Sequence, residues 1–348
     1  MNKFLFKELL KNSDFNIILR SENKKKWDTS MEQFDYFPVL YTNASIDFQE
    51  ECLLGNGQDC EDYSIMFINQ NKILALWPLS LIKKNNSHEL NSFLHSMLHP
   101  IIVKDASRDI KKKLFKETVR IINSFKLEKE SISSISVFQN KNSLDFWNIG
   151  ALDYLKEIRV EYDLLLNLSP SIEEIKKNLR KSTKSSITQS AKLWEANILK
   201  KENKNVWNSF KQLHLEAAGR STRSDLSWEI QEKILIEGNS FLVYISNKKD
   251  IIVGGGLFTI SKDECEYSVA AYNRSLFDQP LGHLVQIKAI EEMKKRNIKF
   301  YKLGRKSHEL NEPKPSTKEV SISLFKEGFS SIFYPILISK HNFKNLKI

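Results

Sequence analysis

Residues that could carry chemistry gather between positions 251 and 329. Three consecutive glycines interrupt an apolar, β-rich run, namely Gly254, Gly255 and Gly256. Glycine leaves the backbone of a strand bare, so a ligand can approach its peptide groups closely. The segment Gln279-Pro-Leu-Gly-His283 then opens a helical pattern, and the unpaired N–H groups of a first helical turn can bind phosphate. We therefore predict that a phosphate-bearing donor is bound by Gly254, Gly255, Gly256, Gln279 and Gly282.

Transfer of a group from a phosphate-bearing donor needs a nucleophile, a group that stabilises developing negative charge, and cations that neutralise donor phosphates. Lys326 could donate to the oxyanion or to a phosphate oxygen; the alternative is a surface lysine lying along Phe325 and Phe329. His283 could act as a base or contact the donor, or could be structural. Tyr267 adds a hydroxyl to its strand. The predicted catalytic residues are Lys326, His283 and Tyr267.

Further basic residues could bind an anionic acceptor or phosphate. Arg220 and Arg223 follow Gly219, where a helix is expected to end, and arginines on such a loop can bind phosphate or carboxylate with two parallel hydrogen bonds. Arg305 opens a loop that could close as a lid over an acidic acceptor. With Lys318, these residues form the predicted acceptor- or phosphate-binding set.

The elements that must position these residues occur twice. Tyr63–Ile82 aligns without a gap on Phe241–Ile260 as two β-rich runs around a polar turn. A helix and a strand follow each hairpin, at 109–125 and 132–138 and at 282–296 and 298–303. Although any two hairpins look alike, the repeated helix–strand pair favours two similar domains in tandem, 1–155 and 156–348. The predicted fold class is α/β of the mixed α+β kind, with a mixed β-sheet flanked by helices in each domain.

The two copies differ where chemistry would occur. Trp77-Pro78 stands in the first copy where Gly255-Gly256 stands in the second. Trp77 would fill the space that glycines leave open, and Pro78 removes a backbone donor. We therefore expect the first domain to be a degenerate copy and the second to carry the transfer site.

Between the domains, a single helix is expected from Ile172 to about Trp194. Lys177, Arg180, Lys181 and Lys184 fall on one face of it at i, i+3, i+4 and i+7. This stripe is either a solvated face or a contact for an anionic partner.

Composition describes an ordinary folded protein. The 348 residues are 41% hydrophobic and 28% charged, with a net charge of +10 that favours anionic ligands. The three cysteines are sparse, and with no histidine set at zinc spacing they argue against disulfides and against a metal site. The N-terminus reads as an amphipathic helix and no window is apolar enough to span a membrane, so we expect a cytoplasmic protein.

The second half of the chain resembles the FemAB-like branch of the GNAT superfamily. The resemblance rests on Gly219–Arg223, Asn273–His283, Tyr301-Lys-Leu-Gly304 and above all Phe325-Lys-Glu-Gly-Phe329. It covers about 162–329 and is mainly architectural before that. Lys326 falls on the lysine that often lies at the transfer centre of this branch. Lys302 stands where an acidic residue is common, and Gln279–Leu284 matches the pyrophosphate loop only in part.

The resemblance implies two tandem GNAT-like domains and an N-acyltransferase acting on an amine of a cell-envelope or surface-glycan precursor. The co-substrate would be acyl-CoA or aminoacyl-tRNA, with no permanently bound cofactor and no metal. The acceptor would be an anionic small molecule such as a nucleotide-sugar or lipid-linked glycan precursor, with tRNA as a possible partner, no DNA, and at most peripheral membrane contact. Three alternatives stay open: an aminoacyl-tRNA-dependent peptidyltransferase of the peptidoglycan-precursor type, an acetyl-CoA-dependent enzyme acting on a nucleotide-sugar, and a non-catalytic RNA- or glycan-binding protein on a worn GNAT scaffold.

Overall fold

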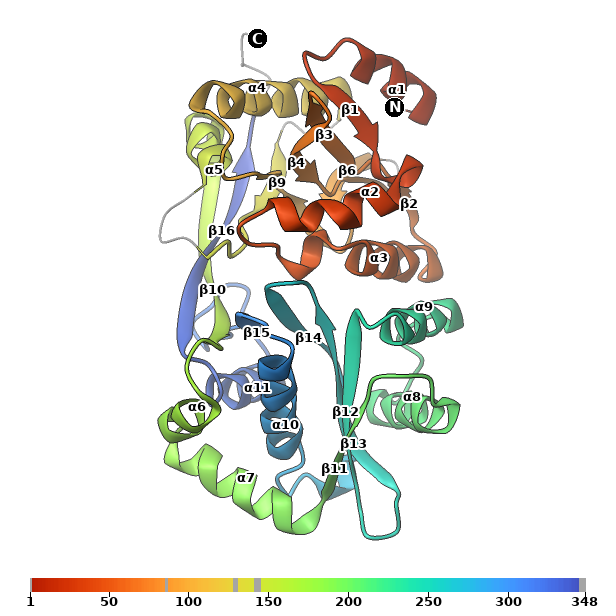
Figure 1. The fold of residues 1–348 in the computed structure, drawn as a ribbon, viewed down its shortest axis with the longest axis vertical. Helices are drawn as coiled ribbons and strands as arrows, with labels where there is room; N and C mark the ends of the chain where they lie inside the picture. The colour runs from red at the N-terminus through yellow and green to blue at the C-terminus, as the bar shows by residue number, and fades with distance from the viewer. Residues whose placement is uncertain (1, 85–86, 128–130, 141–144, 344–348) are drawn as a thin grey trace. The chain divides into compact units, whose positions relative to one another are not determined.

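The structure is a computed structural model that describes residues 2–84, 87–127, 131–140 and 145–343. The chain divides into two compact units (Figure 1): unit 1 is Met1–Val160 with Ile336–Ile348, and unit 2 is Glu161–Pro335. The sequence-based division placed everything after residue 155 in the second domain. The structure differs at the end of the chain, because the last strand pairs within unit 1.

Unit 1 contains short helices and two sheets. Its helices are α1 (Lys3–Lys11), α2 (Lys24–Thr29), α3 (Asn43–Gly55), α4 (Arg108–Ser124) and α5 (Phe146–Ala151). Its strands are β1 (Asn16–Leu19), β2 (Asp59–Asp62), β3 (Ile65–Asn69), β4 (Lys72–Trp77), β5 (Ser80–Lys84), β6 (Ser87–Ser92), β7 (His95–Leu98), β8 (Ile101–Ile102) and β9 (Ile132–Ile135). One sheet has the order β1-β3-β4-β8.

The second sheet of unit 1 begins where the first is interrupted. β4 ends at Trp77, and after Pro78 the chain continues as β5 in the order β9-β7-β6-β5-β2. Proline has no N–H to donate to a ladder, so a change of sheet at this residue is the expected result. β7 and β9 run parallel, with α4 between them in sequence. The last strand, β16 (Ile332–His341), begins in unit 2 and pairs antiparallel with β9 through residues 338–341.

Unit 2 is a mixed sheet with helices on both faces. Its helices are α6 (Ile172–Asn178), α7 (Lys181–Leu193), α8 (Lys204–Ala218), α9 (Asp225–Ile236), α10 (Gly282–Lys295) and α11 (Thr317–Glu327). Its strands are β11 (Glu195–Leu199), β12 (Ser240–Ser246), β13 (Ile252–Ile260), β14 (Glu264–Tyr272), β15 (Phe300–Arg305) and the later part of β10 (Leu155–Asn167). The strand order is β11-β12-β13-β14-β15-β10.

The two faces of this sheet have separate cores. α8 and α9 cover one face, where Phe210 and Trp228 pack against Leu257 and Val269. α10 covers the other, where Val285 and Ile290 belong to the same core cluster as the inward residues of β12 and β13. Figure 1 shows α8 and α9 on one side of β12–β14 and α10 on the other. The expected hairpins and the helices that follow them are therefore confirmed in outline.

The helix expected from Ile172 to Trp194 is wrong as a single element. α6 ends before Leu179 and α7 begins after Arg180, and both residues have extended backbone with ψ near 149° and 146°. Lys177 therefore belongs to α6, whereas Lys181 and Lys184 belong to α7. The basic stripe is therefore not one helical face. The sequence did not reveal this, since the apolar spacing continues evenly across the two-residue break.

The free cysteines Cys52, Cys60 and Cys265 are buried. Within the described ranges, no helix is both long and apolar enough to cross a membrane. The same ranges hold no group of three His, Cys, Asp or Glu side chains placed to bind a metal ion.

Candidate active site

The parallel strands β14 and β15 separate part-way along their length. They pair only at Glu264 with Phe300, Cys265 with Tyr301, and Glu266 with Lys302. Beyond this point β14 continues beside β13 to Tyr272, whereas β15 continues beside β10 to Arg305. Ligands of mixed α/β sheets commonly bind at the carboxyl ends of parallel strands, where neighbouring strands diverge. We call the region beyond Glu266 and Lys302 the strand split.

Charged side chains from three strands meet at the start of the strand split. The Lys302 ammonium lies 3.5 Å from Glu266 Oε1 and 4.0 Å from Asp163 Oδ2. Burial opposes the charge on Lys302, but Glu266 and Asp163 raise its pKa above the ordinary value. The Arg305 Nε lies 3.1 Å from Asp163 Oδ1, and its guanidinium also pairs with Glu161. Arg305 is thus held by two carboxylates and does not stand free on a lid.

Lys326 reaches the same region from the last turn of α11. Its Nζ lies 2.8 Å from the position that a Cβ would take on Gly304, and 5.9 Å from the centre of the Tyr267 ring. Gly304 has a φ of 115°, which only glycine adopts without strain. Burial lowers the pKa of Lys326, with Lys302 acting in the same direction and Glu266 and Asp163 opposing. In the described part of the chain, no carboxylate forms an ion pair with this ammonium.

The glycine run is covered, not bare. β13 is an interior strand paired on both edges, so the backbone of Gly254, Gly255 and Gly256 lies in two ladders. A Cβ on Gly254 would lie 2.5 Å from Tyr272, and one on Gly256 would lie 2.7 Å from Tyr267. Gly255 faces Phe210 on the opposite side at 3.1 Å. The expectation of an open donor wall is wrong, because aromatic rings occupy the space that glycine provides.

Tyr267 and Tyr272 lie on one face of β14, and their hydroxyl groups are 2.8 Å apart. They are five positions apart in the sequence, which would place them on opposite faces of a regular strand. A register shift at Leu257 and Phe258 leaves Ser268 out of the ladder and brings both tyrosines to the same face. Burial raises the pKa of Tyr267 to about 12, so this phenol stays protonated near neutral pH.

The start of α10 lies beside α11. A Cβ on Gly282 would be 2.8 Å from Phe325 and 3.3 Å from the Tyr272 hydroxyl. No side chain caps the first turn of α10. The Gln279 N–H donates to the Leu276 carbonyl, so the predicted loop is a compact turn before the helix.

The His283 ring packs edge-on against Phe325 at 5.1 Å, and also lies near Phe329. Its Nδ1 is buried with no hydrogen-bond partner among the described residues. Burial lowers its pKa, so the imidazole is neutral near pH 7. His283, Tyr267 and Lys326 thus all lie on the α10 side of the sheet.

The remaining predicted residues do not join this group. Arg223 donates to Gln231 at 2.9 Å and lies over the Trp228 ring, in the core on the α8 and α9 side of the sheet. Arg220 is exposed on the same loop, and Lys318 is exposed in the first turn of α11. Arg223 is separated from Lys326 by the sheet, because the loop after Gly219 follows the opposite helical layer.

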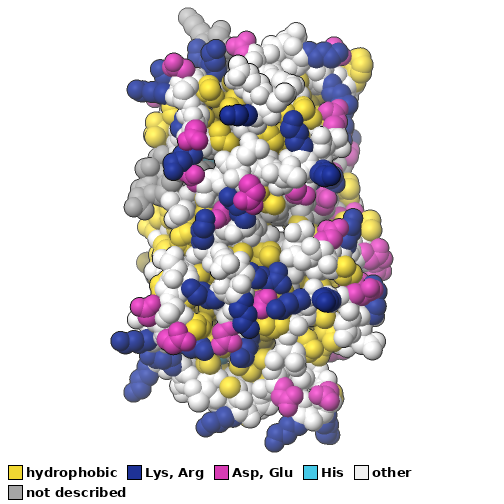
Figure 2. All heavy atoms as spheres, in the orientation of Figure 1, with side chains coloured by type: hydrophobic (Ala, Val, Ile, Leu, Met, Phe, Trp, Pro, Cys, Tyr) yellow, Lys and Arg dark blue, Asp and Glu magenta, His cyan; other side chains and the backbone are white. Residues whose placement is uncertain are grey.

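Sequence reasoning missed Asp163 and Glu266 as site residues. Asp163 directly precedes the apolar residues 164–166 of its strand, and Glu266 lies in a run that was read only for its tyrosines. The signal that could have found them is Lys302, because a lysine inside a buried strand needs carboxylate partners. Figure 2 shows several dark blue basic side chains gathered on unit 2 near the positions of β14 and α10.

No protein-family model matches this chain, and no curated protein matches it in sequence. Solved structures do match. FemX superposes with a TM-score of 0.64 at 11% identity, covering 90% of this chain and 95% of FemX. The C-terminal domain of a putative lysylphosphatidylglycerol synthetase from Agrobacterium fabrum gives a TM-score of 0.58 at 10% identity, covering 92% of each chain.

L-PGS from Bacillus licheniformis gives a TM-score of 0.57 at 10% identity, covering 93% of each chain. These identities establish the fold and no more. The predicted resemblance is confirmed at that level: this chain has a FemAB-like, GNAT-related fold.

Proposed function

We propose that this protein is an N-acyltransferase that moves an acyl or aminoacyl group onto an amine of a cell-envelope or surface-glycan precursor. The observation that carries the proposal is the Lys326 ammonium, which is partly buried at the strand split and has no carboxylate partner in the described chain. A desolvated donor of this kind stabilises a developing oxyanion far more than a solvated one does.

The reaction is direct attack by a neutral acceptor amine on the donor carbonyl. A C–N bond forms, the C–S bond of a thioester or the C–O bond of an ester breaks, and the leaving thiol or hydroxyl takes a proton. Lys326 donates a hydrogen bond to the oxyanion. Glu266 is the proposed acceptor of the amine proton, since its side chain is 24% exposed and pairs loosely with Lys302 at 3.5 Å.

Acyl-CoA is the preferred donor because it requires the simpler contacts. The uncapped first turn of α10 begins beside the Tyr272 hydroxyl and could bind donor phosphates. In this proposal Gln279 and Gly282 contact the donor. The glycines of β13 do not contact it, but leave room for the rings of Tyr267 and Tyr272. The acceptor is an anionic small molecule such as a nucleotide-sugar or lipid-linked glycan precursor, and the reaction takes place in the cytoplasm.

Aminoacyl-tRNA is the second candidate donor. α7 carries exposed Lys181 and Lys184 and has no acidic residue from Lys181 to Leu193. One of the structures with this fold is the C-terminal domain of a putative lysylphosphatidylglycerol synthetase. A tRNA donor would make transfer strongly dependent on salt, with a log–log slope of about −0.7 for each single-stranded phosphate contact.

The test is a transfer assay with acyl-CoA and with charged tRNA, read by mass spectrometry of envelope precursors. Lys326→Gln should lower the transfer rate by about 100- to 1,000-fold, as expected when one oxyanion donor is lost, and should leave thermal unfolding nearly unchanged. Lys233→Gln, an exposed change on α9, is the matched control. Unimpaired transfer by a folded Lys326→Gln protein would exclude this site. Binding of RNA or glycan with no turnover of either donor would favour the non-catalytic alternative.

A further inference from the structure

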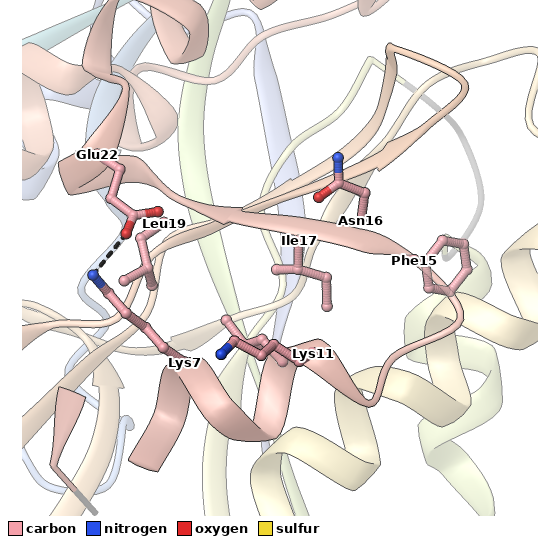
Figure 3. Close-up of a pocket in the computed structure, with 8 residues that line it drawn as sticks. Lys7, Lys11, Phe15, Asn16, Ile17, Leu19 and Glu22 are labelled. Carbon is pink, nitrogen blue, oxygen red and sulfur yellow. Dashed lines mark ion pairs between the residues drawn. The ribbon is translucent and has the colours of Figure 1, made fainter. Parts of the chain in front are cut away.

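A hollow of about 310 Å³ lies between α1 and β1 in unit 1 (Figure 3). Its apolar lining consists of Phe15, Ile17 and Leu19 from β1 and the turn before it, and Leu10 from α1, and Asn16 of β1 also lines it. Lys7 and Lys11 stand at its rim on α1, as Figure 3 shows, and Glu22 lies at one end. The hollow thus joins an apolar floor to a basic rim.

The outer surface of α1 is unusually apolar for a solvated helix. Phe4 is 70% exposed and Leu5 is 54% exposed. Phe4, Lys7 and Lys11 are spaced i, i+3 and i+7, so they lie on the same side of the helix. The exposed Phe4 ring therefore lies on the same side of α1 as Lys7 and Lys11.

The surroundings are basic. Residues 3–26 contain six lysines against three acidic residues, whereas Arg20 in the same stretch is buried and paired with Asp62 and Asp47. The Lys7–Glu22 ion pair, at 2.7 Å, brings the chain before α2 beside α1, and exposed Lys24 and Lys25 follow it directly. Lys11 pairs with Glu8 and Lys24 with Asp47. Exposed pairs of this kind are weak and are readily exchanged for an external anion.

We propose that this face of unit 1 docks on a bilayer that contains anionic phospholipid. Phe4 and Leu5 enter the boundary of the acyl chains, the lysines of α1 and the start of α2 contact lipid phosphates, and the hollow receives part of one acyl chain. Apolar residues flanked by lysines are the features by which an interfacial helix binds a membrane. In Figure 2 basic and apolar side chains adjoin over the region of α1. The proposal concerns unit 1 and does not depend on the proposed reaction.

The experiment is flotation of the full chain with phosphatidylcholine vesicles and with mixed phosphatidylcholine–phosphatidylglycerol vesicles. Binding is expected to the mixed vesicles only and should weaken in high salt. Lys7→Gln with Lys11→Gln should weaken it by about fivefold per lysine. Phe4→Ser with Leu5→Ser should abolish measurable flotation. Both double variants change exposed side chains, so folding should survive.

Matched controls come from the same unit. Leu94→Ser changes a leucine that is 50% exposed, and Lys112→Gln with Lys113→Gln removes two exposed lysines of α4; neither should affect flotation. Hydrogen exchange should show vesicle-dependent protection within residues 3–19. Equal flotation with both vesicle types, a loss with the α4 variant alone, or protection confined to other segments would overturn the proposal. So would protection of residues 16–19 by an added peptide but not by vesicles, since that would make the β1 edge a peptide site.

Discussion

The two units share a hairpin and a strand–helix–strand with parallel strands. They differ in the side chains at matching positions in the second strand of the hairpin. In unit 1, Trp77 is fully buried and its indole N–H donates to the Leu98 carbonyl at 2.7 Å. β4 then stops at Pro78 and the chain enters another sheet. In unit 2, β13 runs through three glycines to Ile260, and tyrosine rings cover it.

The difference shows how one scaffold becomes either a core or a site. Unit 1 closes the position with a single large side chain whose polar atom is satisfied inside the protein. Unit 2 fills the matching space at Gly255 with Phe210, and the spaces on the other face, at Gly254 and Gly256, with Tyr272 and Tyr267. The two tyrosine hydroxyl groups pair with each other, and Lys326 lies over the Tyr267 ring. The polar groups that could meet a substrate are thus kept in unit 2.

The largest expected effect is on the closed position of unit 1. Trp77→Ala should lower the free energy of unfolding by about 3–5 kcal/mol, because it empties a buried aromatic site and removes the indole N–H that donates to the Leu98 carbonyl. Urea unfolding followed by far-UV circular dichroism measures the loss, and Trp77→Phe is the milder control. A loss below about 1 kcal/mol for Trp77→Ala would show that unit 1 does not depend on this side chain, and the contrast between the units would fail.

The glycines of unit 2 give the next effect. Gly254→Ala should destabilise by about 1–3 kcal/mol, as overpacking does, because its Cβ would stand 2.5 Å from Tyr272 Cδ1. Gly255→Ala meets Phe210 at 3.1 Å and should cost less. Thermal unfolding of the two variants side by side tests the order. If Gly255→Ala proved the more harmful, the rings on the tyrosine face would not be what requires glycine.

The smallest expected effect is on how the free energy of unfolding depends on pH, through one histidine in each unit. Burial lowers the pKa of both His283 in unit 2 and His341 in unit 1. The unfolded chain therefore binds more protons below pH ~6.5, and stability should fall as the pH drops through the window between 6.5 and each lowered pKa. His283→Phe should remove its part of this slope with little change at pH 7.

His341 has partners that His283 lacks, since its ring nitrogens lie 3.1 Å from the Ala151 carbonyl and 3.0 Å from the Ser134 hydroxyl. His341→Phe should therefore also lose about 1 kcal/mol at neutral pH. Urea unfolding at pH 5 to 8 measures both variants. If the free energy of unfolding of His283→Phe changed with pH as steeply as that of the unsubstituted protein, burial would not be lowering the pKa of His283.

Much of the fold follows from local patterns, whereas the site depends on tertiary pairing. The repeated hairpin and the α10 helix were predictable because they lie in contiguous, periodic segments, whereas Lys326 was chosen from the Phe-Lys-Glu-Gly-Phe motif and its role stays a prediction. The break at Leu179 and Arg180 was not. Arg180 pairs with Glu327, which lies 147 residues away and also pairs with Lys306.

The charged group at the strand split was hidden for the same reason. Asp163, Glu266 and Lys302 come from β10, β14 and β15, and their meeting depends on strand order. The glycine run shows the limit most clearly. The sequence reveals that side chains are missing at 254–256, but only packing shows that neighbouring rings take their place.

The pairing of β16 with β9 has a consequence for how the chain is made. Residues 338–341 add a strand beside 132–135 in unit 1, and they are synthesised after all of unit 2. Unit 2 is one continuous segment, so on a ribosome it can complete its sheet while unit 1, which emerged earlier, still lacks a strand and exposes the edge of β9. The half that is translated first is thus the half that is finished last, and a chain halted just after Pro335 would carry its defect in unit 1.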